Sequence, residues 1–189
     1  MTSPLDPARR RFMHRTTVAG AAALAGLGAA GATRAAVPAP AGARTLDFVH
    51  THTGERISLV FAVGADLLPD ALSALNRFLR DHYTGEVGRI DPRLFDMLHR
   101  VRGLVGSAAP FEVISGYRCA ATNERLRQSG GGGVARRSLH MDGRAIDVRL
   151  RGVKLADLRD AALELRGGGV GYYPRDAFVH MDTGPLRAW

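Results

Sequence analysis

The stretch from Ser138 to Leu150, SLHMDGRAIDVRL, constrains the fold of this chain more than any other. His140 and Asp147 stand seven residues apart, and on one unbroken helix such positions lie about 10 Å apart along the axis. Gly143 interrupts the stretch, and the residues after it alternate in the way that is typical of a strand. We therefore predict a loop with His140, a glycine turn and a strand with Asp147, so that the chain folds back and brings both side chains to one point.

A second histidine extends this pattern. In the segment FVHMD, His180 and Asp182 alternate onto one face of a predicted strand. If this strand lies beside the strand of Asp147, then His140, Asp147 and His180 converge. Two imidazoles and one carboxylate suit catalytic zinc, which commonly takes three protein ligands and a water molecule. A lone histidine is more often structural, so spacing alone leaves both interpretations open.

The first 44 residues differ in composition from the rest. A basic region, RRRFMHRT, precedes the apolar run VAGAAALAGLGAAGA, which is too short to span a bilayer, and the small residues that follow suit cleavage. Arg9, Arg10, Phe12 and Met13 fit the twin-arginine export pattern, although Ala8 replaces the usual Ser or Thr. We predict an export signal and linker over residues 1–44 and one domain over 45–189; the alternatives are an uncleaved membrane anchor or a disordered basic tail.

Composition and charge narrow the class of protein. A chain of 189 residues, of which 46% are hydrophobic, suits one globular domain with a substantial core. Residues 1–44 hold six arginines and one aspartate, so only +3 of the formal net charge of +8 belongs to the predicted domain. That part also lacks a basic run with interleaved aromatic residues, which argues against nucleic acid as a partner. Cys119 is the only cysteine, which excludes an internal disulfide and a thiolate metal cluster.

Periodicity indicates an α+β fold with a mostly antiparallel sheet and helices packed on it. A hairpin with its turn at Thr53-Gly54 opens the domain. Asp91 and Pro92 mark the start of a helix as N-cap and first helical residue. His50 and His52 alternate onto one face of the first strand, and without a carboxylate partner we expect them to be exposed. The remaining predictions are helices over 69–83, 91–106, 121–129 and 153–165, and strands over 111–117, 169–174 and 177–184.

The stretch Ser138-x-His140-x-x-Gly143-x-Ala145-x-Asp147 matches the signature S-x-H-x-x-G-x-A-x-D of the D-Ala-D-Ala carboxypeptidase-like zinc peptidases. Along nearly the whole predicted domain the chain resembles one branch of them, the murein endopeptidase K family. Landmarks of this resemblance include HTGERISL, VISGYRCAATNERLR and GGVGYYPRDAFVHMDTG.

The resemblance implies a fold like that of hedgehog and the D-Ala-D-Ala peptidases. It also implies a periplasmic enzyme that hydrolyses peptide cross-links in peptidoglycan, with one zinc ion per chain on His140, Asp147 and His180. Its partners would be the peptide stems of peptidoglycan, with no nucleic acid and no stable membrane insertion after signal cleavage. Two departures from the family pattern are Cys119-Ala120 in place of Ser-Pro, and Asp142 in place of a neutral residue such as Gln.

Three residues of the motifs are candidates for substrate binding. The guanidinium of Arg118 has the donor geometry to bind a substrate carboxylate or a developing oxyanion, and its alternative role is an ordinary salt bridge. Ser138 is a candidate hydrogen-bond partner of the substrate, or it holds the loop. Tyr173 either lines the predicted substrate cleft or packs against neighbouring side chains.

The general base is the least determined part of the predicted site. Carboxypeptidase relatives use a glutamate three residues before the last histidine, but Ala177 occupies that position here. We expect Asp182 to act as the base because it shares a face with His180, and Asp176 is the second candidate. The alternative role of Asp182 is to orient the imidazole of a metal ligand.

Two other functions remain compatible with the same motifs. One is a carboxypeptidase that removes terminal D-Ala. The other is a non-catalytic, zinc-containing domain for wall binding or signalling, since hedgehog keeps the metal without evident peptidase activity.

Overall fold

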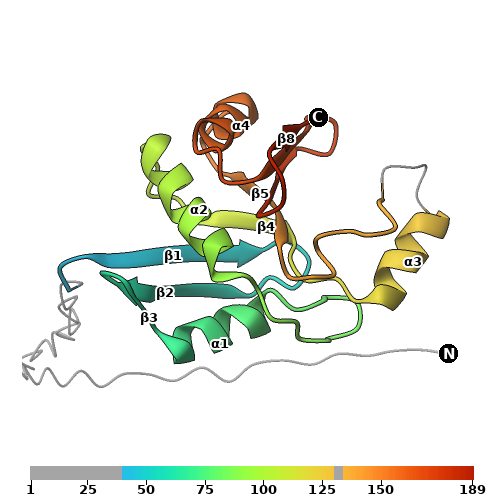
Figure 1. Ribbon diagram of the computed structural model, residues 1–189, viewed down its shortest axis with the longest axis horizontal. Coiled ribbons are helices and arrows are strands. Elements are labelled where there is room, and N and C mark those ends of the chain that lie inside the picture. Colours follow the sequence, from blue (N-terminus) through green and yellow to red (C-terminus); the bar gives the residue numbers. More distant parts are fainter. Residues whose placement is uncertain (1–39, 130–133) are drawn as a thin grey trace, which may run out of the picture. The chain divides into compact units, whose positions relative to one another are not determined.

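The computed structural model describes residues 40–129 and 134–189 (Figure 1). Most of the predicted export signal and linker therefore lies outside the described residues. Within the described part, four helices accompany the strands: α1 (Pro69–Phe78), α2 (Pro92–Leu104), α3 (Ala120–Ser129) and α4 (Leu155–Glu164). The strands are β1 (Ala43–His50), β2 (Arg56–Val63), β3 (Asp66–Leu67), β4 (Phe111–Ser115), β5 (Ala145–Leu150), β6 (Gly169–Tyr173), β7 (Phe178–Asp182) and β8 (Arg187–Ala188).

These strands form one mixed sheet in the order β3-β2-β1-β4-β5-β7-β6-β8. Most neighbours are antiparallel, whereas β1 pairs with β4 and β6 with β8 in parallel. The predicted α+β class with a mostly antiparallel sheet is confirmed. The predicted hairpin corresponds to β1 and β2, and Gly54 in its turn has a φ of 72°, which glycine adopts without strain.

The hydrophobic core lies between the sheet and the helices, where α2 packs on β1, α4 packs on β5, β6 and β7, and the two helices contact each other (Figure 1). Leu94, Leu98 and Val101 of α2 are fully buried, as the spacing of apolar residues predicts. The helix also begins as predicted, because the carboxylate of Asp91 accepts a hydrogen bond from the backbone N–H of Arg93 at 3.0 Å.

The glycine turn before β5 is fixed by close packing. Gly143 has a φ of 64°, and a Cβ atom there would lie 1.9 Å from the carbonyl oxygen of Arg89. Only glycine fits this position. The turn is held by the carbonyl of Gly143, which accepts a hydrogen bond from the N–H of Asp91 at 2.9 Å. The chain therefore folds back between His140 and β5, as the sequence predicts.

Candidate metal centre and active site

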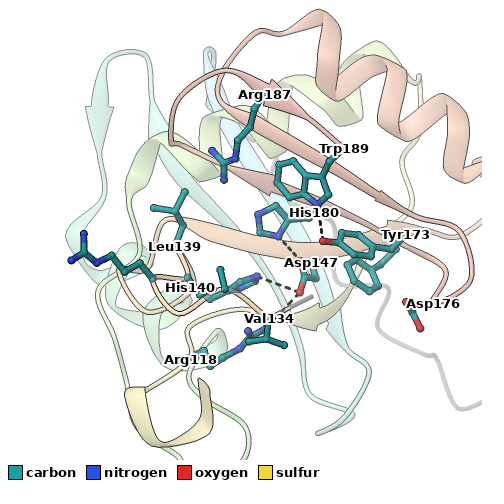
Figure 2. A pocket seen from close by; sticks show the side chains of 14 residues that line it. Arg118, Val134, Leu139, His140, Asp147, Tyr173, Asp176, His180, Arg187 and Trp189 are labelled. Carbon is teal, nitrogen blue, oxygen red and sulfur yellow. Dashed lines mark hydrogen bonds and ion pairs between the residues drawn. The ribbon is translucent and has the colours of Figure 1, made fainter. Parts of the chain in front are cut away.

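Strand pairing places two of the candidate ligands side by side. In the antiparallel pair of β5 and β7, Asp147 lies opposite His180. His140 comes from the turn that precedes β5, and its imidazole points to the same place (Figure 2). Ligand atoms of His140, Asp147 and His180, the ligand triad below, lie within 4.8 Å of one another. The structure thus brings together the three residues that the sequence singles out.

Each histidine of the ligand triad has one nitrogen held by an acceptor. Nδ1 of His140 lies 2.7 Å from the carbonyl oxygen of Gly116, so this nitrogen donates and Nε2 keeps its lone pair. Nε2 of His140 lies 3.3 Å from Oδ2 of Asp147. In His180 the roles are reversed: Nε2 lies 3.2 Å from Oδ2 of Asp182, and Nδ1 lies 2.8 Å from Oδ1 of Asp147. This donor set, with both imidazoles oriented by acceptors, fits a divalent metal ion.

The electrostatics of the ligand triad also favour a bound cation. Burial lowers the pKa of His180, but hydrogen bonds to Asp147 and Asp182 outweigh burial and raise that pKa to about 9. Burial opposes the ionisation of Asp147, yet the two histidines hold its pKa well below the usual range. A metal ion must therefore displace a proton from His180, so metal affinity falls as the pH falls.

Asp182 lies behind His180 rather than in open space. Its side chain is fully buried, and its Oδ1 accepts hydrogen bonds from the N–H groups of Gly169 at 3.1 Å and Gly184 at 2.7 Å. Its Oδ2 faces His180 and accepts from Nη2 of Arg187 at 2.6 Å. A carboxylate with this many donors has little capacity left for a water molecule. The geometry therefore favours the role in which Asp182 orients His180.

A cavity of about 260 Å³ opens above the ligand triad (Figure 2). Of the other candidate site residues, Arg118, Ser138, Tyr173 and Asp176 line this cavity, and Asp182 does not. Asp176 is thus a carboxylate in the cavity wall outside the ligand triad.

Arg118 is largely buried but only loosely held. Its guanidinium lies 3.3 Å from Oγ of Ser115, 3.4 Å from Oδ1 of Asn123 and 4.0 Å from Oδ2 of Asp147. These contacts are long for charge-assisted hydrogen bonds, so the donors of Arg118 remain available to a ligand. The geometry argues against an ordinary salt bridge as its main role.

The cavity wall also contains residues that the sequence analysis did not single out, and those with polar or aromatic side chains include Arg137, Arg187 and Trp189. Trp189 follows β8, and its ring centroid lies 5.4 Å from that of His180, while its Nε1 donates to the hydroxyl of Tyr173 at 2.7 Å. Its position depends on the parallel pairing of β8 with β6, for which the sequence carries no local signal.

A second group of histidines lies outside the ligand triad. His50, His52 and His82, the histidine cluster below, have ring centroids 4.3 to 5.9 Å apart. His52 is exposed as expected, but the prediction is wrong for His50, which is only 1% exposed. The reason is that β1 lies inside the sheet and Phe78 of α1 packs against the His50 ring at 6.0 Å.

Comparison with known proteins places the chain among bacterial wall enzymes. Residues 38–189 match the family described as "Peptidoglycan L,D-endopeptidase MepK". The Escherichia coli K12 protein of that name is 47% identical over 146 residues, which are 77% of this chain and 80% of the relative. The "Probable peptidoglycan L,D-endopeptidase MepK" of Haemophilus influenzae is 45% identical over 148 residues, 77% of this chain and 78% of the relative. No solved structure matches the chain significantly.

Among the helices within residues 40–129 and 134–189, none has the length and apolar character needed to cross a bilayer.

Proposed function

The chain belongs to the peptidoglycan L,D-endopeptidase MepK family, and on that premise we propose that it is a zinc-dependent enzyme that hydrolyses L,D-peptide cross-links of peptidoglycan. The observation that carries this proposal is the convergence of the ligand triad at the base of a cavity within the matched residues. A carboxypeptidase and a non-catalytic wall-binding domain are the alternatives that the experiment below must exclude.

Zinc is the ion that this donor set suits best, because two imidazoles and one carboxylate are typical ligands of catalytic zinc. Nε2 of His140, the carboxylate of Asp147 and Nδ1 of His180 would hold one ion per chain. When bound, the ion supplies Lewis-acid activation of the scissile carbonyl and of the attacking water. Asp182 holds Nε2 of the His180 ring, which would leave Nδ1 for the ion.

For the general base we propose Asp176 in place of Asp182. Asp176 lines the cavity, whereas the oxygens of Asp182 are already occupied by backbone N–H groups, His180 and Arg187. A base must reach the proton that it takes, either directly or through water. Asp176 is exposed and lies beyond Tyr173 from the ligand triad (Figure 2), so we propose that it acts through a water molecule in the cavity. Asp176 then accepts the proton of the attacking water and returns it to the leaving amine.

Side chains around the cavity supply the contacts to the substrate. Arg118 donates to the carbonyl oxygen as negative charge develops on it, or to a carboxylate of the peptide stem. Ser138 and Tyr173 offer hydroxyl groups in the same cavity. Arg137 and Arg187 add positive charge to its wall, which suits an anionic peptide.

The remaining parts of the proposal concern location and fold. Residues 1–44 would be an export signal of the twin-arginine type with a linker, and residues 45–189 the periplasmic zinc peptidase domain. The basic and apolar layout of the first segment and the peptidoglycan-directed relatives support this arrangement. The placement of the ligand triad on a turn and two antiparallel strands supports a fold like that of hedgehog and the D-Ala-D-Ala peptidases.

Incubation of purified protein with cross-linked muropeptides tests the function directly. We expect monomeric muropeptides as products by mass spectrometry, loss of activity after chelation and recovery when zinc is added. The His140→Ala protein serves as the inactive control. Release of D-Ala alone would identify a carboxypeptidase, and unchanged muropeptides together with binding to the wall would identify a binding domain.

A further inference from the structure

A second cavity, of about 210 Å³, adjoins the first. Arg118, Asp147 and Phe178 line both cavities, so the two meet at Asp147 of the ligand triad. The rest of the second wall comes from other elements. Its residues include His52 from the turn between β1 and β2, His82 and Tyr83 from the loop after α1, and Leu126 from α3.

Asp81 holds this wall in place. Its buried carboxylate accepts hydrogen bonds from the N–H of Tyr83 at 2.9 Å and from the N–H of Cys119 at 2.9 Å. The loop after α1 is thereby tied to the segment that follows Arg118. His82 stacks on His52 with ring centroids 4.3 Å apart and an angle of 3° between the planes. These hydrogen bonds and the ring stacking fix the positions of the side chains that form the wall.

His82 lines this wall and has one ring nitrogen without a hydrogen-bond partner among the described residues. This nitrogen, Nε2, is shielded from solvent. Burial, followed by the neighbouring His52, lowers the pKa of His82, so its imidazole is neutral near pH 7. An enclosed nitrogen without a partner carries a cost in free energy that a ligand group could relieve.

The two cavities differ in charge. Arg137, Arg187 and Asp176 line only the first cavity, where Arg187 is paired with the buried Asp182, whereas Arg118 is common to both. The side chains confined to the second cavity are imidazoles, tyrosines, small polar or aliphatic residues and Asp81, whose oxygens are occupied. The first cavity therefore suits carboxylates, and the second suits the amide groups and aliphatic carbons of a peptide.

We propose that the second cavity binds one of the two peptide stems of the cross-linked substrate, by packing against the stacked His52 and His82 and by a hydrogen bond to His82. The proposal rests on the endopeptidase function above, because a cross-link joins two stems and must extend to both sides of the bond that is cut. Arg118 and Asp147 lie where the cavities meet, so the scissile bond would lie between the two stems.

Filling the second cavity tests this assignment. Leu126→Trp places an indole in it, and Leu163→Trp, at an exposed leucine of α4 outside both cavities, is the matched control. For cross-linked muropeptide we expect Leu126→Trp to raise KM at least tenfold at normal zinc content and nearly unchanged kcat. The control should match the wild type in both constants.

Substitutions of His82 separate packing from hydrogen bonding and do not depend on how Leu126→Trp folds. His82→Phe keeps a stacked ring without a donor, and His82→Gln keeps a donor without the ring. Each should raise KM several-fold. Because the contact is uncharged, this increase should not change with salt, unlike the effect of Arg137→Ala in the first cavity.

The outcomes distinguish the two proposals. A wild-type protein that leaves cross-links uncut overturns the proposed function and this assignment together. An active wild type whose KM is unchanged in Leu126→Trp and both His82 variants overturns only the assignment. A loss of zinc or a fall in kcat alone in those variants also overturns it, since the residues would then act on the metal site.

Discussion

The ligand triad and the histidine cluster show what turns neighbouring imidazoles into a metal site. Both groups gather histidines from segments distant in the sequence. Among the described residues, however, only the ligand triad brings three ligand atoms within 4.8 Å of one another. The triad has a carboxylate between its histidines, whereas the rings of the cluster face one another without one.

The pKa values of the two groups shift in opposite directions. Carboxylates outweigh burial and raise the pKa of His180 to about 9. Burial, with His82 and His52 as further causes, lowers the pKa of His50 to about 4. The surroundings of His180 therefore favour a positive charge, carried by a proton or by a metal ion that replaces it, whereas the surroundings of His50 keep its imidazole neutral. The difference teaches that the carboxylates which orient the imidazoles and balance a bound cation, not the number of histidines, define the candidate metal centre.

Removal of a ligand should have the largest effect. We expect His140→Ala, Asp147→Ala and His180→Ala each to abolish stoichiometric zinc and hydrolysis, because two remaining ligands do not supply the geometry. His50→Phe, in the histidine cluster, should keep both. Metal analysis and muropeptide hydrolysis on the four proteins measure this, and a zinc-free His50→Phe protein would contradict the distinction between the groups.

The second largest effects should distinguish the roles of the two aspartates near the triad, Asp176 and Asp182. Asp176→Asn should lose about 10² or more in turnover with zinc retained, since it removes the base. Asp182→Asn should weaken zinc binding about 10- to 100-fold by loosening His180, and regain turnover at saturating zinc. Zinc titrations and rates on both variants are the measurement. A zinc-replete but inactive Asp182→Asn protein beside an active Asp176→Asn protein would return the base role to Asp182.

Arg118 lies between the two histidine groups, and its substitution should lower the rate of hydrolysis without changing the zinc content. Arg118→Ala should lower turnover by about 10² to 10³, the usual cost of losing one donor to a developing oxyanion. Arg159→Ala, at an arginine of α4 outside both cavities, is the control. If Arg118→Ala loses zinc or unfolds, its role is structural.

The smallest effect concerns stability in acid. His50 has an ordinary pKa of 6.5 when unfolded and about 4 when folded, so the unfolded state takes up the proton first as the pH falls. The contribution of neutral His50 is complete above pH 6.5 and is lost as the pH falls towards 4, by about 3 kcal/mol at most. Urea unfolding of the metal-free protein at pH 7 and 4.5 should show a smaller acid loss in His50→Phe. Equal losses in both proteins would mean that His50 does not titrate in this range.

Local patterns predicted much of the fold and the site. The alternation after Gly143 and in FVHMD depends on neighbouring residues alone, and it placed Asp147 and His180 on strands. That these two strands are neighbours was a condition at that point, and the family resemblance supplied the ligand set. The β1–β2 hairpin and the start of α2 at Asp91 follow from turn and capping residues in the same way.

Features that depend on distant pairing were not predictable. The parallel pairing of β1 with β4 and of β6 with β8 carries no local signal, and the positions of His50 and Trp189 follow from it. Alternation gave the face on which Asp182 lies. It did not reveal that backbone N–H groups and Arg187 would surround the carboxylate.

The hydrogen bonds of Asp91 connect the turn that carries His140 to the start of α2. Asp91 accepts from Arg93 at the start of α2 and from the hydroxyl of Thr183 after β7 at 2.7 Å, and its N–H holds the carbonyl of Gly143. We therefore expect helix, turn and strand to open together, with amides of the turn at His140 exchanging with solvent mainly through cooperative unfolding. If zinc binds only the folded form, substitutions at Asp91 that let α2 and this turn open more often should also increase the loss of zinc.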